Sequence, residues 1–131
     1  MELLVTLPGA SLDKGEPVQV WVRPLGEIET CELMAKTNTL RTMAQAAETP
    51  AAAKKLFLPL ALRVAQAAIV RPALRKKQLL ALGEDLLLLA GVIFCFSSTK
   101  SEVIAREWLR LALAARTVPA QPPGRTTAWL N

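Results

Sequence analysis

The stretch Ala68–Ser97 places the strongest limits on how this chain can fold. It joins an Ile-Val-Arg-Pro break, a basic patch, a Gly-Glu-Asp interruption and the most apolar run of the sequence. That run, Leu86–Phe96, has eleven residues, whereas a membrane-spanning helix needs about 20. Extending it back over Leu79–Phe96 would place Glu84 and Asp85 in hydrocarbon, at a cost of about 3 kcal/mol each. The stretch therefore favours a buried core helix over a membrane span.

Two segments near the N-terminus have the pattern of strands. Residues 17–23, PVQVWVR, alternate apolar and polar side chains with the period of a half-buried strand, and Pro24 ends the alternation. Residues 2–7 are compatible with a strand and lead into the turn signal Pro8-Gly9. We expect an antiparallel hairpin that packs against helices, because two strands alone are marginally stable.

The remainder of the chain favours helices, since Leu and Ala dominate and Tyr is absent. Proline and capping residues divide it. The Thr49-Pro50 pair is typical of a helix start, Pro59 predicts a kink or break, and the residue before Pro72 ends the element. The expected helices cover residues 26–47, 49–69, 83–96 and 101–116, with 73–82 as a basic connector or helical turn.

The predicted fold is therefore mainly α: a small helical domain of about four helices with a short N-terminal β-hairpin. The strand pair occupies residues 1–25 and the helical domain residues 26–116. A flexible, Pro-rich C-terminal tail is expected over residues 117–131. In the last helix, apolar residues recur at steps of four, three and four and predict one apolar face, formed by Ile104, Trp108, Leu111 and Ala115.

The sequence gives little support to catalysis. It contains no histidine, which excludes histidine-based triads and histidine metal ligands, and it has no Gly-rich phosphate loop. The adjacent acids Glu84 and Asp85 are best explained as capping and solvation of a helix start. Cys31 and Cys95 are expected to be buried, reduced thiols of an intracellular protein. We therefore predict a non-enzymatic protein without metal or cofactor.

Positive charge is concentrated in the middle of the chain. Residues 49–83 carry seven basic side chains and no acid: Lys54, Lys55, Arg63, Arg71, Arg75, Lys76 and Lys77. Such a segment could bind an acidic protein or a phosphate backbone. No aromatic side chain is interleaved with the densest charges, Arg71, Arg75, Lys76 and Lys77, so base stacking is not supported there and nucleic acid is disfavoured. The candidate partner-binding residues are Arg71, Arg75, Lys76, Lys77, Trp108, and the tail residues Trp129 and Leu130.

The order of these segments resembles that of tail assembly chaperones from long-tailed phages. The resemblance lies in PVQVWVRP followed by an acid-rich helix, and in AAIVRPALRKKQLLALGEDLLLLAGVIFCFSS, and it covers roughly residues 17–98. It is a resemblance of pattern rather than of invariant active-site residues. The matching positions, which are expected to be structural, are Val20, Val22, Arg23, Pro24, Val70, Pro72, Leu74, Asp85 and Leu89.

The resemblance implies a non-enzymatic protein, made in the cytoplasm of an infected bacterium, that coats the tape measure protein before tail tube subunits polymerise around it. Its expected partners are the tape measure protein and the tail tube protein, and a homo-oligomer is a further expectation. Two alternatives remain from the residues themselves. One is a small membrane-associated protein using Leu79–Phe96, and the other is a basic nucleic-acid-binding regulator using residues 54–77.

Overall fold

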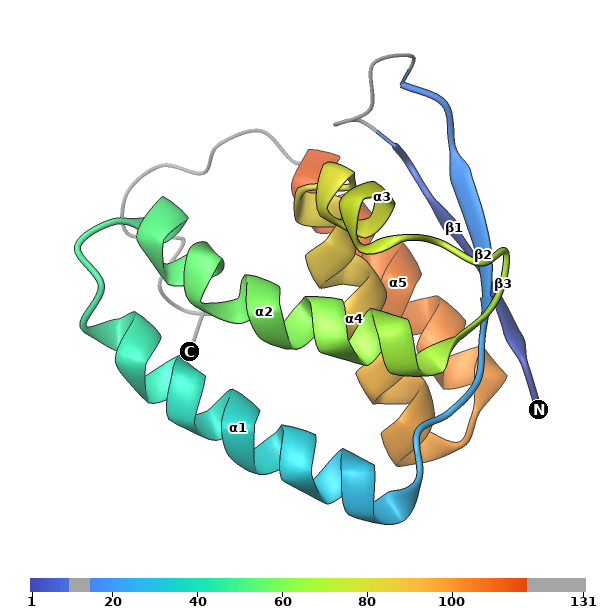
Figure 1. Ribbon diagram of the computed structural model, residues 1–131, viewed down its shortest axis with the longest axis horizontal. Helices are drawn as coiled ribbons and strands as arrows, with labels where there is room; N and C mark the ends of the chain where they lie inside the picture. Colours follow the sequence, from blue (N-terminus) through green and yellow to red (C-terminus); the bar gives the residue numbers. More distant parts are fainter. Residues whose placement is uncertain (10–14, 118–131) are drawn as a thin grey trace.

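The computed structural model describes residues 1–9 and 15–117. Within them, three strands and five helices follow one another along the chain (Figure 1). In order, they are β1 (Leu3–Leu7), β2 (Val18–Val22), α1 (Glu27–Gln45), α2 (Pro50–Ala68), β3 (Ile69–Arg71), α3 (Lys76–Ala81), α4 (Glu84–Thr99) and α5 (Glu102–Thr117). The expectation of a mainly helical fold with an N-terminal hairpin is confirmed.

The sheet is antiparallel, and β2 lies at its centre. β1 and β2 pair from Leu3–Val22 to Leu7–Val18. Since side chains alternate across a strand, this register turns one apolar face of both strands towards the helices. On this face Val18 is partly buried, and the other residues are fully buried: Leu3, Val5, Leu7, Val20 and Val22.

The third strand was not expected from the sequence. The chain leaves α2 at Ala68 and becomes extended over β3, which pairs with β2 and ends immediately before Pro72. The Arg23 backbone N–H donates to the Ala68 carbonyl at 2.9 Å where α2 meets β3. A residue before proline avoids helical geometry, so Pro72 predicted the end of α2 correctly. The pairing of β3 with β2 depends on contacts between distant parts of the chain, which the local sequence does not show.

Two further differences concern the helices. α2 continues through Pro59 without the break that this proline predicted. The basic connector contains a separate short helix, α3, which raises the count in the described residues from about four to five. Gly83 separates α3 from α4 and has a positive φ of 60°, a conformation that favours glycine.

α4 is the centre of the hydrophobic core. It packs between α2 and α5, and the helices together cover the inner face of the sheet (Figure 1). Its fully buried apolar side chains are Leu86, Leu89, Val92, Ile93 and Phe96. Ser97 adds two buried hydrogen bonds to this core. Its Oγ accepts from the Leu25 N–H at 2.9 Å and donates to the Ile93 carbonyl at 2.7 Å. None of the described helices is long and apolar enough to cross a membrane.

α5 contacts this core through Ala105 and the partly buried Leu109, whereas other large apolar side chains of the helix face outward. Ala105 is fully buried, whereas Ile104 and Leu111 are 51% and 54% exposed. The apolar stripe predicted for this helix therefore exists, but it is a surface feature. We call Ile104, Trp108, Leu111 and Ala115 the α5 stripe.

Candidate functional site: an apolar groove

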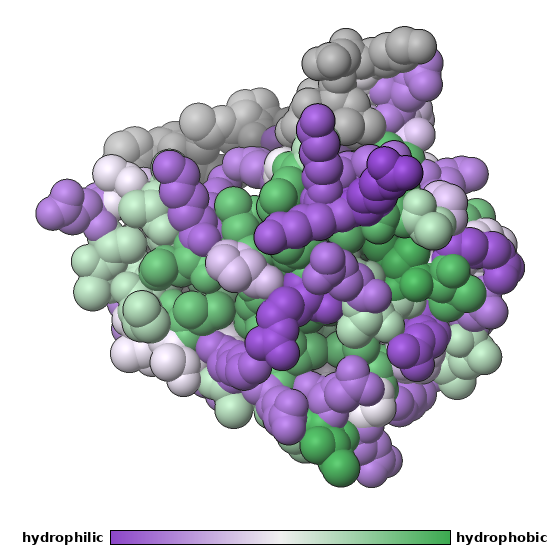
Figure 2. Space-filling view, in the orientation of Figure 1, coloured by the Kyte–Doolittle hydropathy of each residue, from purple (hydrophilic) through white to green (hydrophobic). Residues whose placement is uncertain are grey.

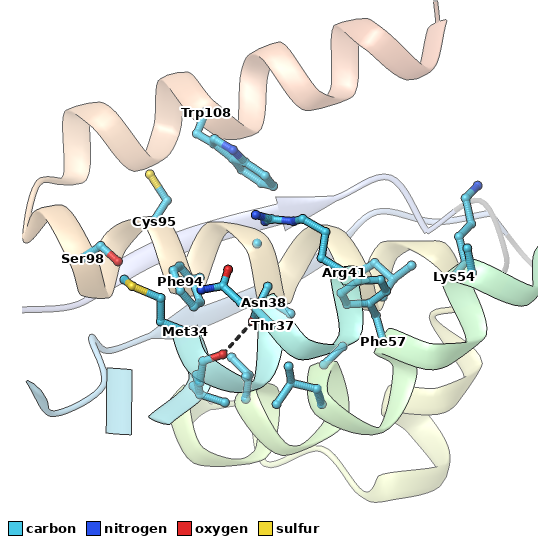
Figure 3. A pocket seen from close by; sticks show the side chains of 18 of the residues that line it. Met34, Thr37, Asn38, Arg41, Lys54, Phe57, Phe94, Cys95, Ser98 and Trp108 are labelled. Atoms are coloured by element: carbon cyan, nitrogen blue, oxygen red, sulfur yellow. Dashed lines mark hydrogen bonds between the residues drawn. The ribbon is translucent and has the colours of Figure 1, made fainter. Parts of the chain in front are cut away.

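An open groove with a volume of about 860 Å³ lies between the α1–α2 pair and the α4–α5 pair. This volume is within the range of small-molecule sites, roughly 300–1,000 Å³. Figure 3 shows side chains from all four helices converging on it. Its large apolar lining residues include Met34, Phe57, Leu60, Leu87, Phe94 and Trp108.

The groove exists because α1 does not close down on α4. Thr30 is the only buried residue of α1, and Met34 and Met43 are about half exposed. The middle of the helix is the polar Thr37-Asn38-Thr39 sequence, and the Thr37 hydroxyl donates to the Leu33 carbonyl of the same helix at 2.7 Å. Such a segment offers no apolar side chains to fill the gap. In the view of Figure 2, patches of apolar surface lie between charged and polar side chains.

Trp108 reaches the groove wall because α4 has a glycine opposite it. A Cβ added to Gly91 would lie 2.2 Å from Cη2 of the Trp108 ring, far inside van der Waals contact. Only glycine lets the indole lie this close to the α4 backbone. Trp108 is also 37% exposed and belongs to the α5 stripe. It therefore makes the groove continuous with the apolar surface of α5.

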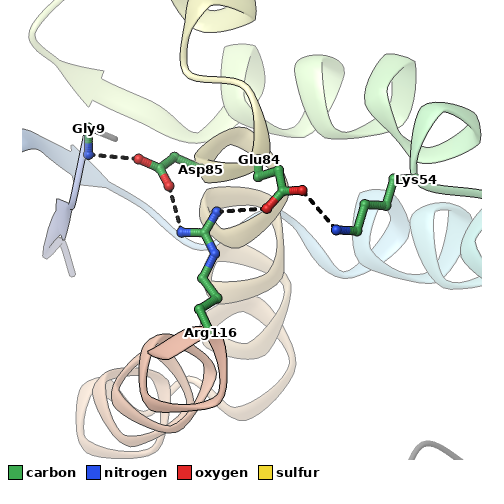
Figure 4. A network of polar contacts seen from close by, with 5 residues as sticks. All are labelled: Gly9, Lys54, Glu84, Asp85 and Arg116. Carbon is green, nitrogen blue, oxygen red and sulfur yellow. Dashed lines mark hydrogen bonds and ion pairs between the residues drawn. The ribbon is translucent and has the colours of Figure 1, made fainter. Parts of the chain in front are cut away.

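Charged side chains from three helices meet at one end of the groove, together with a backbone N–H from the segment after β1 (Figure 4). Lys54, which lines the groove, pairs with Glu84 at 2.8 Å. Arg116 pairs with Asp85 at 2.7 Å and with Glu84 at 3.4 Å. The Gly9 N–H donates to the second Asp85 oxygen at 2.8 Å. The network ties the starts of α2 and α4 to the end of α5 and to the segment after β1.

The two acids of this network differ in environment. Glu84 is exposed, and the hydrogen bond and charge of Lys54 lower its pKa from the ordinary value of 4.5. Asp85 is only 1% exposed and has its carboxylate between Arg116 and the Gly9 backbone. The sequence-based explanation of both residues as solvated capping groups is thus wrong for Asp85, which is a buried ion-pair partner.

Arg41 is the positively charged residue of the groove without an acidic partner in the described part of the chain. It points from α1 into the groove (Figure 3). None of the ion pairs within residues 1–9 and 15–117 includes it. A guanidinium beside an apolar lining complements an occupant that combines apolar side chains with a negative charge.

Of the sequence-derived candidate residues that the structure describes, Trp108 alone lies in the groove. Arg71 is on β3, where it pairs with Glu2 at 3.0 Å and lies 4.9 Å above the Trp21 ring. Arg75, Lys76 and Lys77 are exposed around the start of α3 and line no part of the groove. Trp129, Leu130 and the rest of the predicted tail after Thr117 lie outside the described residues.

Several groove residues had no signal in the sequence. Phe57 and Leu60 fall in an ordinary apolar helix, and Gly91 is a single glycine inside an apolar run. The polar interruption in α1 was the one visible indication that this helix would not be a core helix. No group of three or more Cys, Asp or Glu side chains in the described residues is placed to hold a metal ion.

The cysteines differ from expectation, and they provide a probe of the groove. Cys31 is exposed on α1 rather than buried, whereas Cys95 is partly buried and lines the groove. Burial raises the pKa of the Cys95 thiol above its ordinary value of 9.0. Because the thiolate is the reactive form, this lowers its reactivity near neutral pH.

At about pH 8, Cys95 is expected to react with iodoacetamide more slowly than Cys31, and its rate should keep rising as the pH passes the ordinary thiol value. Mass spectrometry of the two cysteine-containing peptides measures both rates in one sample. Equal rates for the two thiols would contradict the partial burial of Cys95.

No protein-family model, curated protein or solved structure matches this chain. Its functional interpretation therefore depends on the groove, the charges around it and the sequence pattern.

Proposed function

We propose that this protein is a non-enzymatic tail assembly chaperone of a long-tailed phage. In this proposal it binds an apolar helical face of the tape measure protein, keeps that protein soluble and supports assembly of the tail tube around it. The observation that carries the proposal is the open apolar groove, which continues through Trp108 onto the exposed α5 stripe. The partner's identity comes from the resemblance in residues 17–98, and the binding mode comes from the groove.

The proposed contact is a helix lying in a groove. An amphipathic helix presents apolar side chains at successive turns, and proteins that bind such helices offer an elongated apolar depression. Here Phe57, Leu87 and Phe94 would accept those side chains, while Trp108 would cover the helix edge. A tape measure protein is a long helix with an apolar face, so it needs such cover before assembly.

Arg41 makes the proposed contact selective for the charge of the bound helix. A helix with an acidic residue beside its apolar stripe would place that acid against the guanidinium, and a basic residue there would be repelled. Lys54, at the other charged position of the lining, is already paired with Glu84. The proposal therefore favours tape measure segments that have an acid next to apolar residues spaced by three and four.

Replacing Trp108 with Ala is expected to weaken tape measure binding about 30-fold, which corresponds to the loss of one aromatic hot spot. The assay is co-expression with the tape measure protein from the same genome, followed by its soluble fraction and by titration of purified proteins. The matched control is Trp21→Ala, because Trp21 lies on the sheet next to Arg71 and lines no part of the groove.

A second variant keeps every groove side chain. Gly91→Ala adds a methyl group where the Trp108 ring lies, so the ring must move off α4 and change the groove. It should weaken binding while circular dichroism remains that of the native helical fold. If the tape measure protein is equally soluble with and without this chain, or if Trp108→Ala and Trp21→Ala bind it equally well, the proposal is wrong.

A further inference from the structure

The described part of the chain leaves the groove open, and the chain continues from one end of it. α5 ends at Thr117. The preceding Arg116 pairs with Glu84, and Glu84 pairs with the groove residue Lys54. Residues 118–131 therefore start close to the charged end of the groove.

The distances allow the tail to reach the groove. Phe94, on the groove wall, lies ten residues along α4 from Glu84, or about 15 Å at the helical rise. Trp129 is twelve residues beyond Thr117. Twelve residues of polypeptide can reach at most about 40 Å. The tail is therefore long enough to bring the Trp129 indole to the groove.

The composition of the tail suits the groove. Its first part, VPAQPPGRTT, is rich in proline and polar residues, and Trp129 and Leu130 then supply its large apolar side chains. Tryptophan buries more apolar area than most side chains and prefers aromatic neighbours in offset or edge-to-face contact. The groove offers Phe57, Phe94 and Trp108 for such contacts.

Tethering makes weak docking sufficient. A short linker gives the tail an effective concentration of about 1 mM at the groove. A two-residue anchor with a dissociation constant of about 0.1 mM would then occupy the groove about 90% of the time. The same anchor from a second copy at micromolar concentration would be almost absent, so the chain's own tail is the favoured occupant.

We propose that Trp129 and Leu130 dock in the groove of their own chain and compete with the partner. The tail would cover the apolar surface until an apolar helix displaces it. This regulatory role rests on the proposed function, because the competition concerns the same groove. The docking itself does not depend on which partner binds.

Thiol protection tests the docking. The full chain is compared with a chain ending at Thr117 and with Trp129→Ala, by alkylation of Cys95 with Cys31 as the internal reference. Both changes should raise the Cys95 rate about 5- to 10-fold, as expected for a groove occupied about 90% of the time, and leave the Cys31 rate unchanged. Thr126→Ala is the matched control in the same tail and should behave as the full chain does.

Two outcomes would overturn the inference. One is a Cys95 rate that is the same in all four proteins. The other is protection that increases with protein concentration, since it would place a second copy in the groove. As an independent readout, removal of the tail should shift the NMR methyl signals of Leu60 and Leu87, which line the groove, and not those of Leu3 in the sheet. Unchanged groove signals would also reject docking.

Titration with the tape measure protein separates this inference from the proposed function. If both hold, the chain ending at Thr117 should bind the partner up to about 10-fold more tightly than the full chain does. Tail-dependent protection of Cys95 without partner binding would reject the function and keep the inference. Partner binding of equal strength with and without the tail, together with unprotected Cys95, would reject the inference and keep the function.

Discussion

Replacement of Arg116 with Met is expected to lower the free energy of unfolding by about 3 kcal/mol, because it removes the partner of a buried charge. Asp85 is 1% exposed, and without Arg116 its carboxylate would keep the Gly9 N–H as its hydrogen-bond donor. Met preserves much of the apolar stem of Arg116, so the loss should report the charge rather than the packing. Urea denaturation followed by circular dichroism measures the change.

A double-mutant cycle identifies the cause of that loss. Asp85→Asn retains an oxygen that can accept from the Gly9 N–H, and it leaves Arg116, which is 29% exposed, close to Glu84. We expect this variant to lose only about 1 kcal/mol. The double variant Asp85→Asn with Arg116→Met contains no unpaired buried charge, so it should be more stable than Arg116→Met alone.

The matched control is Arg106→Met on the same helix. Arg106 is 62% exposed and pairs with Glu102 at 3.7 Å across one turn. Exposed pairs of this kind contribute at most about 0.5 kcal/mol. If Arg116→Met were no more destabilising than Arg106→Met, the ion pair at Asp85 would not be part of the folded core.

Replacement of Phe96 with Ala is expected to cost about 4 kcal/mol of stability, which is in the range for large aromatic residues removed from a core. Phe96 is the largest of the fully buried side chains and lies on α4, at the centre of the core. Its removal forfeits the transfer free energy of the ring and leaves a cavity that rigid neighbouring helices cannot fill. The loss should appear as a lower urea midpoint with an unchanged slope.

Phe57→Ala is the informative comparison for Phe96→Ala. Both variants remove the same ring, but Phe57 lines the open groove and is only partly buried. Its removal should cost less than about 2 kcal/mol, because the space left is continuous with solvent. The same variant should weaken partner binding. Equal losses of stability for the two variants would mean that the groove is as closed as the core.

Parts of the fold could be predicted because local rules decide them. Strict alternation in residues 17–23 produced β2 with its buried valines, and Thr49 starts α2, where its hydroxyl accepts from the Ala52 N–H at 3.1 Å. The apolar run of α4 is buried, as its composition required. In each case the pattern that predicts the element lies within a few consecutive residues.

Other parts could not be predicted, because they depend on which surfaces meet. Ile104 and Leu111 have the spacing of a core face, yet both are about half exposed, and α5 packs on the core through Ala105 and Leu109 instead. An amphipathic pattern shows that a helix has an apolar side and does not show whether anything in the same chain covers it. The candidate site, which combines that uncovered side with the groove, was therefore only partly visible through Trp108.

By itself, the sequence determined the helical class, the hairpin, the burial of the apolar run in α4 and the residues at which most elements end. These follow from side-chain period, proline geometry and capping, which act within a few residues. Only the tertiary structure decided that β3 joins the sheet, that Asp85 meets Arg116, and that α1 stays away from α4 to leave a groove. Those features depend on contacts between distant segments, and their free energies arise only when the whole chain has packed.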